Sequence, residues 1–206
     1  MSSPAAAPSM IHKDYEGAKL GMWLFLFTEI LLFGGLFILY SAYRARYPLD
    51  FHNSGQHLNV VIGVLNTAIL LTSSLTMALS IAAIQKGNRR LSMLCLASTI
   101  IMGALFVVDK YIEWSGEIHH GLYPNSPILG RQPHGEQIFF GLYYSMTGLH
   151  GLHVLAGILV LSVMFVFLVG GKVSSTDFNK LENAGLYWHL VDVIWIFLLP
   201  LFYLAA

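Results

Sequence analysis

Five long apolar runs determine what this chain can fold into. Each run holds the roughly 20 consecutive residues that an α-helix needs to cross a hydrocarbon layer. The runs cover residues 21–43, 59–84, 91–114, 138–169 and 186–204. The composition agrees, because only 11% of the residues are charged, against roughly 25% in soluble domains. The sequence therefore predicts an all-α polytopic membrane protein with five transmembrane helices.

Basic residues predict the orientation of the helices. Seven lie on one side of the predicted spans, and four lie on the other. The first group is Lys13, Lys19, Lys86, Arg89, Arg90, Lys172 and Lys180, and the second is Arg44, Arg46, Lys110 and Arg131. Cytoplasmic sides are richer in Lys and Arg, so we expect a cytoplasmic tail over residues 1–20, one transmembrane domain over residues 21–206 and an external C-terminus. The tail lacks a basic region followed by an apolar stretch, so it does not resemble a cleavable signal peptide.

Charge and cysteine content exclude several classes of partner and cofactor. The formal net charge is zero, which argues against a nucleic-acid partner. Cys95 is the only cysteine. This chain alone can therefore form no disulfide, no Cys-x-x-Cys metal site and no covalent c-type haem attachment.

Five ionisable side chains lie within the apolar runs: Glu29, His150, His153, His189 and Asp192. An unpaired polar group of this kind is costly in hydrocarbon, so we expect these side chains to face other helices. His150 and His153 are three residues apart on one predicted helix, as are His189 and Asp192 on the next, so each pair shares a helix face. These residues are the first place to look for function.

Two interpretations of these ionisable side chains remain open. Haem ligation by imidazoles from facing helices is chemically possible, although a carboxylate-bridged metal bundle would require further Glu-x-x-His motifs. The favoured reading is a hydrogen-bond network of His189, Asp192 and one of the two histidines His150 and His153, with no metal. For Glu29, a proton-handling or lipid-facing role and a purely structural role both remain open.

Other spacings predict contacts between helices. Asn59, Asn66, Ser73 and Ser80 recur every seven residues and should form one polar stripe against a neighbouring helix. Small residues, chiefly Gly148 and Gly151, should allow close packing of the fourth span. Lys110 and Glu113 are three residues apart, and we expect an interfacial ion pair of little energetic value. Residues 115–136 are rich in Pro and Gly and predict an ordered external loop.

Five sequence stretches resemble, in order, the signature segments of subunit III of haem-copper respiratory oxidases. They are GMWLFLFTEILLFGGLF, LNTAILLTSS, YIEW, TGLHGLHVLAG and YWHLVDVIWIFLLPLFY, and together they extend over about residues 20–203. The resemblance is to the short bacterial type with five helices. It implies a V-shaped bundle, with helices 1 and 2 against helices 3 to 5, in a bacterial cytoplasmic membrane.

The resemblance also implies a function. Subunit III of a cytochrome c or quinol oxidase holds no redox cofactor, and the haems and copper belong to its partner subunits. It packs on the catalytic subunit I, with subunit II and a small subunit IV nearby, holds phospholipids, and supports proton uptake and stability during turnover. Six residues match family positions: Glu29, Glu113, His150, His153, His189 and Asp192. The adjacent charges Asp109 and Lys110 depart from the pattern.

The alternatives are a proton-coupled membrane transporter and a two-helix haem b protein, because both place acid and imidazole groups within a membrane. The catalytic subunit of an oxidase is excluded. It needs several histidines from several helices, and a binuclear copper module needs two cysteines.

Overall fold

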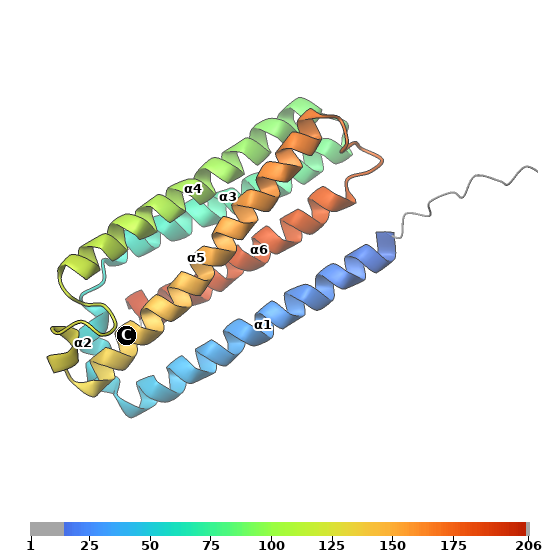
Figure 1. Cartoon of the computed structure of the whole chain (residues 1–206). Helices are drawn as coiled ribbons and strands as arrows, with labels where there is room; N and C mark the ends of the chain where they lie inside the picture. The colour runs from blue at the N-terminus through green and yellow to red at the C-terminus, as the bar shows by residue number, and fades with distance from the viewer. Residues whose placement is uncertain (1–14, 205–206) are drawn as a thin grey trace, which may run out of the picture.

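Long helices run side by side through the computed structural model, which describes residues 15–204 (Figure 1). The elements are α1 (Tyr15–Arg46), α2 (Pro48–Gly55), α3 (Val60–Gln85), α4 (Arg89–His119), the 3-10 turn η1 (Leu129–Arg131), α5 (His134–Val169), α6 (Asn179–Leu199) and the π-helical turn η2 (Pro200–Leu204). Five helices are long and apolar enough to cross a membrane: α1, α3, α4, α5, and α6 with η2. The predicted all-α membrane architecture is confirmed.

Four of the five membrane helices are longer than the apolar runs that predict them, and α3 has the same length as its run. The first begins at Tyr15, so the last six residues of the predicted tail are helical, while residues 1–14 lie outside the described part of the chain. α4 ends at His119 and α5 begins at His134, which shortens the predicted loop at both ends. Hydropathy detects only the part of a helix that fits within hydrocarbon, and polar residues continue these helices beyond it.

α3 and α4 form an antiparallel pair joined by a tight turn in which Gly87 has a φ of 76°. Asn66, Ser73 and Ser80 are fully buried on α3, as the seven-residue repeat predicts. Ser80 donates a 2.9 Å hydrogen bond to the carbonyl of Ser92, and Thr76 and Thr99 join their hydroxyls at 2.8 Å. Polar contacts therefore run along the interface between these two helices.

The fourth residue of the predicted stripe has a different role. Asn59 is exposed and lies just before the first turn of α3. Its side-chain oxygen accepts hydrogen bonds from the backbone N–H groups of Val61 at 3.0 Å and Ile62 at 3.3 Å. These donors have no partner within the helix, so Asn59 acts as an N-cap. The prediction that it packs between helices was wrong, because the repeat extends one step past the start of the helix.

α6 packs against α3, α5 and α1. Its buried Trp188 fits into notches at Gly103 of α4 and Gly157 of α5, where a Cβ would lie 2.6 Å and 2.8 Å from the indole. Of the glycines predicted for close packing, Gly148 contacts Trp114 at 3.2 Å from its Cβ position. Gly151 has no atom within 4 Å of that position. Close packing therefore uses the predicted Gly148 and also Gly103 and Gly157, which the sequence pattern did not single out.

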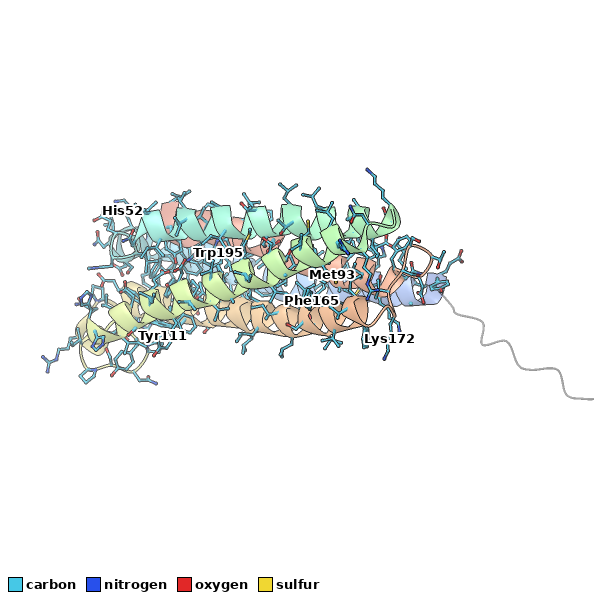
Figure 2. All side chains as sticks on the ribbon, turned by 90° about the horizontal axis from the view of Figure 1, so that it is seen from above. His52, Met93, Tyr111, Phe165, Lys172 and Trp195 are labelled. Atoms are coloured by element: carbon cyan, nitrogen blue, oxygen red, sulfur yellow. The ribbon has the colours of Figure 1, made fainter. Side chains whose placement is uncertain are left out.

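α1 lies along one side of the bundle, against α5 and α6 (Figure 1). The second membrane helix, α3, instead packs against α4 and α6. A V shape made by the first two membrane helices against the other three is therefore not confirmed. Figure 2 shows His52 and Lys172 near opposite ends of the bundle and Trp195 between them. The short helix α2 packs on α5, where Asp50 accepts a 3.1 Å hydrogen bond from the backbone N–H of Gly135.

Candidate functional site

Glu29 of α1 and His153 of α5 form a polar pair across two helices. His153 Nε2 lies 2.9 Å from Glu29 Oε2, and the two side chains are 16% and 14% exposed. The other ring nitrogen, Nδ1, lies 2.8 Å from the carbonyl of Leu149. A carbonyl can only accept, so Nδ1 carries a proton and donates it. The remaining proton is shared between Glu29 and Nε2, either as acid and neutral imidazole or as carboxylate and imidazolium.

His189 of α6 reaches to α3 instead of to another histidine. Its Nδ1 lies 2.7 Å from the hydroxyl of Ser74. Ser74 also lies beside the Asp192 carboxyl, but neither carboxyl oxygen of that buried residue has a hydrogen bond of acceptable geometry. The predicted network of His189, Asp192 and one of the α5 histidines is therefore wrong. His189 and Asp192 share a helix face, but this does not bring their side chains into contact with each other. The partner of each side chain depends on which neighbouring helix lies within its reach.

His150 lies in an aromatic cage in the core. It is fully buried, with Phe106 at 5.5 Å and Trp195 at 5.2 Å between ring centroids. Neither ring nitrogen has a hydrogen-bond partner. His150 and His153 therefore face different interfaces. Within residues 15–204, no three His, Cys, Asp or Glu side chains gather in a way that could hold a metal ion.

Lys110 and Glu113 form a buried ion pair toward the end of the bundle where α2 lies. Lys110 Nζ is 2.9 Å from Glu113 Oε2, with side chains 9% and 3% exposed. Lys110 also donates to the hydroxyls of Tyr203 at 2.9 Å and Tyr143 at 3.2 Å, and lies 5.2 Å from the centre of the Trp195 ring. Both tyrosines donate to Glu113 Oε1, Tyr143 at 2.7 Å. All three donors of the ammonium group are used.

The expected interfacial ion pair is thus a buried cluster that joins α4, α5 and η2. The expectation was wrong because α5 and η2 bring tyrosines over a site that a helix end would otherwise leave in water. The sequence signal was present, since Tyr143 stands in the fourth apolar run and Tyr203 in the fifth. Their distances along the chain, 33 and 93 residues from Lys110, gave no reason to connect them.

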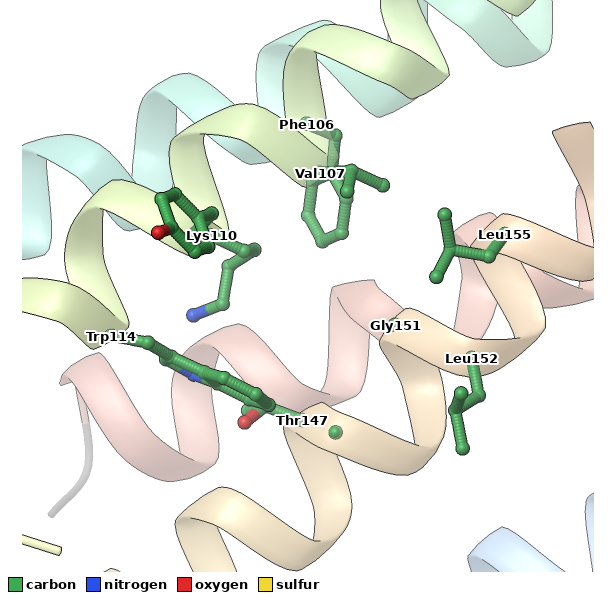
Figure 3. A pocket seen from close by; sticks show the side chains of 10 residues that line it. Phe106, Val107, Lys110, Trp114, Thr147, Gly151, Leu152 and Leu155 are labelled. Atoms are coloured by element: carbon green, nitrogen blue, oxygen red, sulfur yellow. The ribbon is translucent and has the colours of Figure 1, made fainter.

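Two grooves lie between the helices that carry the polar pairs. The first, of about 390 Å³, lies between α4 and α5 next to Lys110 and Trp114, with Leu152 and Leu155 at its far end (Figure 3). The second, of about 500 Å³, lies where α1, α5 and α6 meet. Phe25, Val160 and Tyr187 contribute apolar walls to it, and Lys180 and Asn183 add polar groups near the start of α6. Both grooves are lined mainly by apolar side chains.

The fold and these polar pairs define a class: a multi-pass helical membrane protein whose ionisable groups within the membrane helices join those helices to one another. The sequence matches the family described as cytochrome c oxidase subunit III over residues 9–206. The chain belongs to that family, as a subunit III of the haem-copper oxidases.

Individual relatives agree with the family assignment. A cytochrome c oxidase subunit 3 of Thermostichus vulcanus is 32% identical over 98% of this chain and 94% of its own length. The protein of the same description from Synechocystis is 34% identical, over 94% of this chain and 77% of its own. A haem-copper oxidase subunit I+III of Aeropyrum pernix is 27% identical, over 91% of this chain and 22% of that much longer relative.

Proposed function

We propose that this chain is the non-redox accessory subunit of a bacterial terminal oxidase, which reduces oxygen to water and pumps protons. The observation that carries the proposal is how the ionisable groups within the membrane helices are used. Glu29 bonds to His153 and joins α1 to α5, and Lys110 bonds to Glu113 within a cluster that joins α4, α5 and η2. These groups hold helices together, so the chain supports a reaction that takes place in other subunits.

The direct partner in this proposal is the catalytic subunit I. A relative described as subunit I+III carries both subunits in one polypeptide, which supports their direct contact. The haems and copper belong to the partner chains, with subunit II and a small subunit IV also in the complex. This chain holds neither haem nor copper.

Phospholipid is the proposed ligand of the groove between α1, α5 and α6. Apolar walls such as Phe25 and Val160 suit an acyl chain, while Lys180 and Asn183 suit a phosphate headgroup. The groove lies at the same end of the bundle as the ion pair between Lys19 and Glu182, whose atoms are 2.9 Å apart. This end carries most of the basic residues, so it is the proposed cytoplasmic side, with the N-terminal tail there and the C-terminus outside.

Support of proton uptake is the proposed role of the Glu29 and His153 pair. Its shared proton can move between carboxyl and imidazole without a large change in geometry, since the two atoms are already 2.9 Å apart. Both side chains are partly exposed at the surface of the bundle, where a neighbouring subunit or water can reach them.

Purified oxidase with and without this chain tests the proposal. Removal should leave the haem spectra and the metal content of the complex unchanged. Oxygen consumption should start moderately lower, most clearly at high pH where protons are scarce, and should decay faster over repeated turnovers. Loss of a haem or copper with the chain would show that it holds a cofactor. An unchanged initial rate together with an unchanged lifetime would remove the supporting role.

A further inference from the structure

His189 leaves one polar atom unsatisfied in the middle of the membrane. Its Nδ1 is bonded to Ser74, but no described residue hydrogen-bonds its Nε2, and the ring is only partly buried. The residue stands ten positions into α6, about 15 Å along the axis, near the centre of a hydrocarbon layer of about 30 Å. Acyl chains offer no hydrogen bond there, so lipid alone leaves this nitrogen unpaired.

An apolar groove lies on the same face of α6. Val193, one helical turn after His189, lines a groove of about 320 Å³ between α1 and α6. Phe33 and Phe37 of α1 and Phe197 of α6 form much of its wall. The groove offers a place for apolar side chains from a neighbouring helix, next to a polar atom that needs a partner.

Small residues make the same face accessible to another backbone. Gly34 lines the groove, Gly35 is exposed beside it, and neither has an atom within 4 Å of its Cβ position. Small residues let transmembrane helices approach closely. α1 itself is the least covered of the five spans, with 11% of its most apolar window buried, against 50% for α6.

We propose that the face formed by α1, α6 and α3 around His189, called here the His189 face, docks against a transmembrane helix of the catalytic subunit. That helix presents a hydrogen-bonding side chain to His189 Nε2 at mid-membrane and places apolar side chains in the groove beside Val193. The inference rests on the proposed function, in which this chain packs directly on subunit I. It specifies which surface of this chain makes the contact, at what depth in the membrane the contact lies and which chemical groups it joins.

Site-specific photocrosslinking in the assembled oxidase tests the choice of face. A benzoylphenylalanine replaces Val193 on the His189 face or, as a matched control, Leu155 on the face between α4 and α5; the two residues are 46% and 45% exposed. We expect adducts with the catalytic subunit from position 193 and none from position 155. Adducts from 155 alone, from both positions or from neither would overturn the inference while leaving the proposed function standing. Failure of the unmodified chain to purify with subunit I would instead overturn the proposed function.

Two substitutions at His189 test the polar contact. His189→Leu removes both hydrogen bonds and should lower the amount of this chain retained per catalytic subunit after a detergent wash, by roughly 3- to 20-fold. His189→Gln keeps a side chain that can donate and accept, and should retain most of it. Melting of the isolated chain is followed alongside, because loss of the Ser74 bond affects both measurements. Equal retention of the two variants, or a loss fully accounted for by melting, would overturn the contact.

Discussion

Glu29 and His153 join the first and fourth membrane helices through one contact of 2.9 Å, between residues 124 positions apart in the sequence. Because the N–H at His153 Nδ1 donates to the Leu149 carbonyl, the hydrogen bond to Glu29 is made by the other ring nitrogen, Nε2. The contact holds two helices together, and in the proposed function it also exchanges one proton.

Substitutions at Glu29 separate these two properties. Glu29→Ala leaves His153 Nε2 unpaired, and should lower the free energy of unfolding by about 1–3 kcal/mol. Glu29→Gln keeps a hydrogen bond but cannot exchange the proton, so it should preserve most of the stability. If the pair assists proton uptake, both variants should lower oxygen consumption at high pH. A glutamine variant with an unchanged pH–rate profile would make the pair structural only.

Replacing Lys110 or Glu113 alone should destabilise the subunit far more than replacing both residues together. Lys110→Met leaves a buried carboxylate facing two tyrosines, and Glu113→Gln leaves a buried ammonium group. Each should cost about 3–5 kcal/mol, because an unpaired charge remains in a nonpolar site. The double variant should recover much of that loss. Thermal melting of the purified subunit measures all three, and additive losses would contradict the assigned coupling.

His150 should tolerate an apolar replacement that His153 does not. Neither nitrogen of His150 is hydrogen-bonded, so His150→Leu removes unsatisfied polar atoms and should leave stability nearly unchanged or raised. His153→Leu breaks the bond to Glu29 and should lower stability. Iron and copper per catalytic subunit should be the same in both variants and in the parent oxidase. A metal lost with either histidine would identify that histidine as a ligand.

The charge asymmetry gives a prediction about topology. A reporter enzyme fused after Ala206 should be active outside the cytoplasm, and one inserted in the connection between α5 and α6 should be active inside it. Lys172 and Lys180 lie in or next to that connection and should keep it on the cytoplasmic side. Paired reporters, one active on each side of the membrane, provide the measurement. The reverse pattern would invert the proposed orientation.

Patterns within a single helix were predictable from the sequence, whereas contacts between helices were not. The five spans follow from hydropathy, and the burial of Asn66, Ser73 and Ser80 follows from their seven-residue spacing. The partners of these groups depend on which helices become neighbours. Glu29 could not be assigned to His153, or His189 to Ser74, before the packing of α1 on α5 and of α3 on α6 was known. The burial of Lys110 depended on tyrosines from two other elements.

Trp188 lies between Gly103 and Gly157, and this arrangement has a consequence for how such sequences can diverge. The indole occupies the space that a methyl group on either glycine would need, with separations of 2.6 Å and 2.8 Å. The three positions, on α4, α5 and α6, therefore share one fixed volume. A relative that carries alanine at either glycine should carry a smaller side chain than tryptophan at the third position. The three residues should change together over evolution, as one unit of covariation spanning three helices.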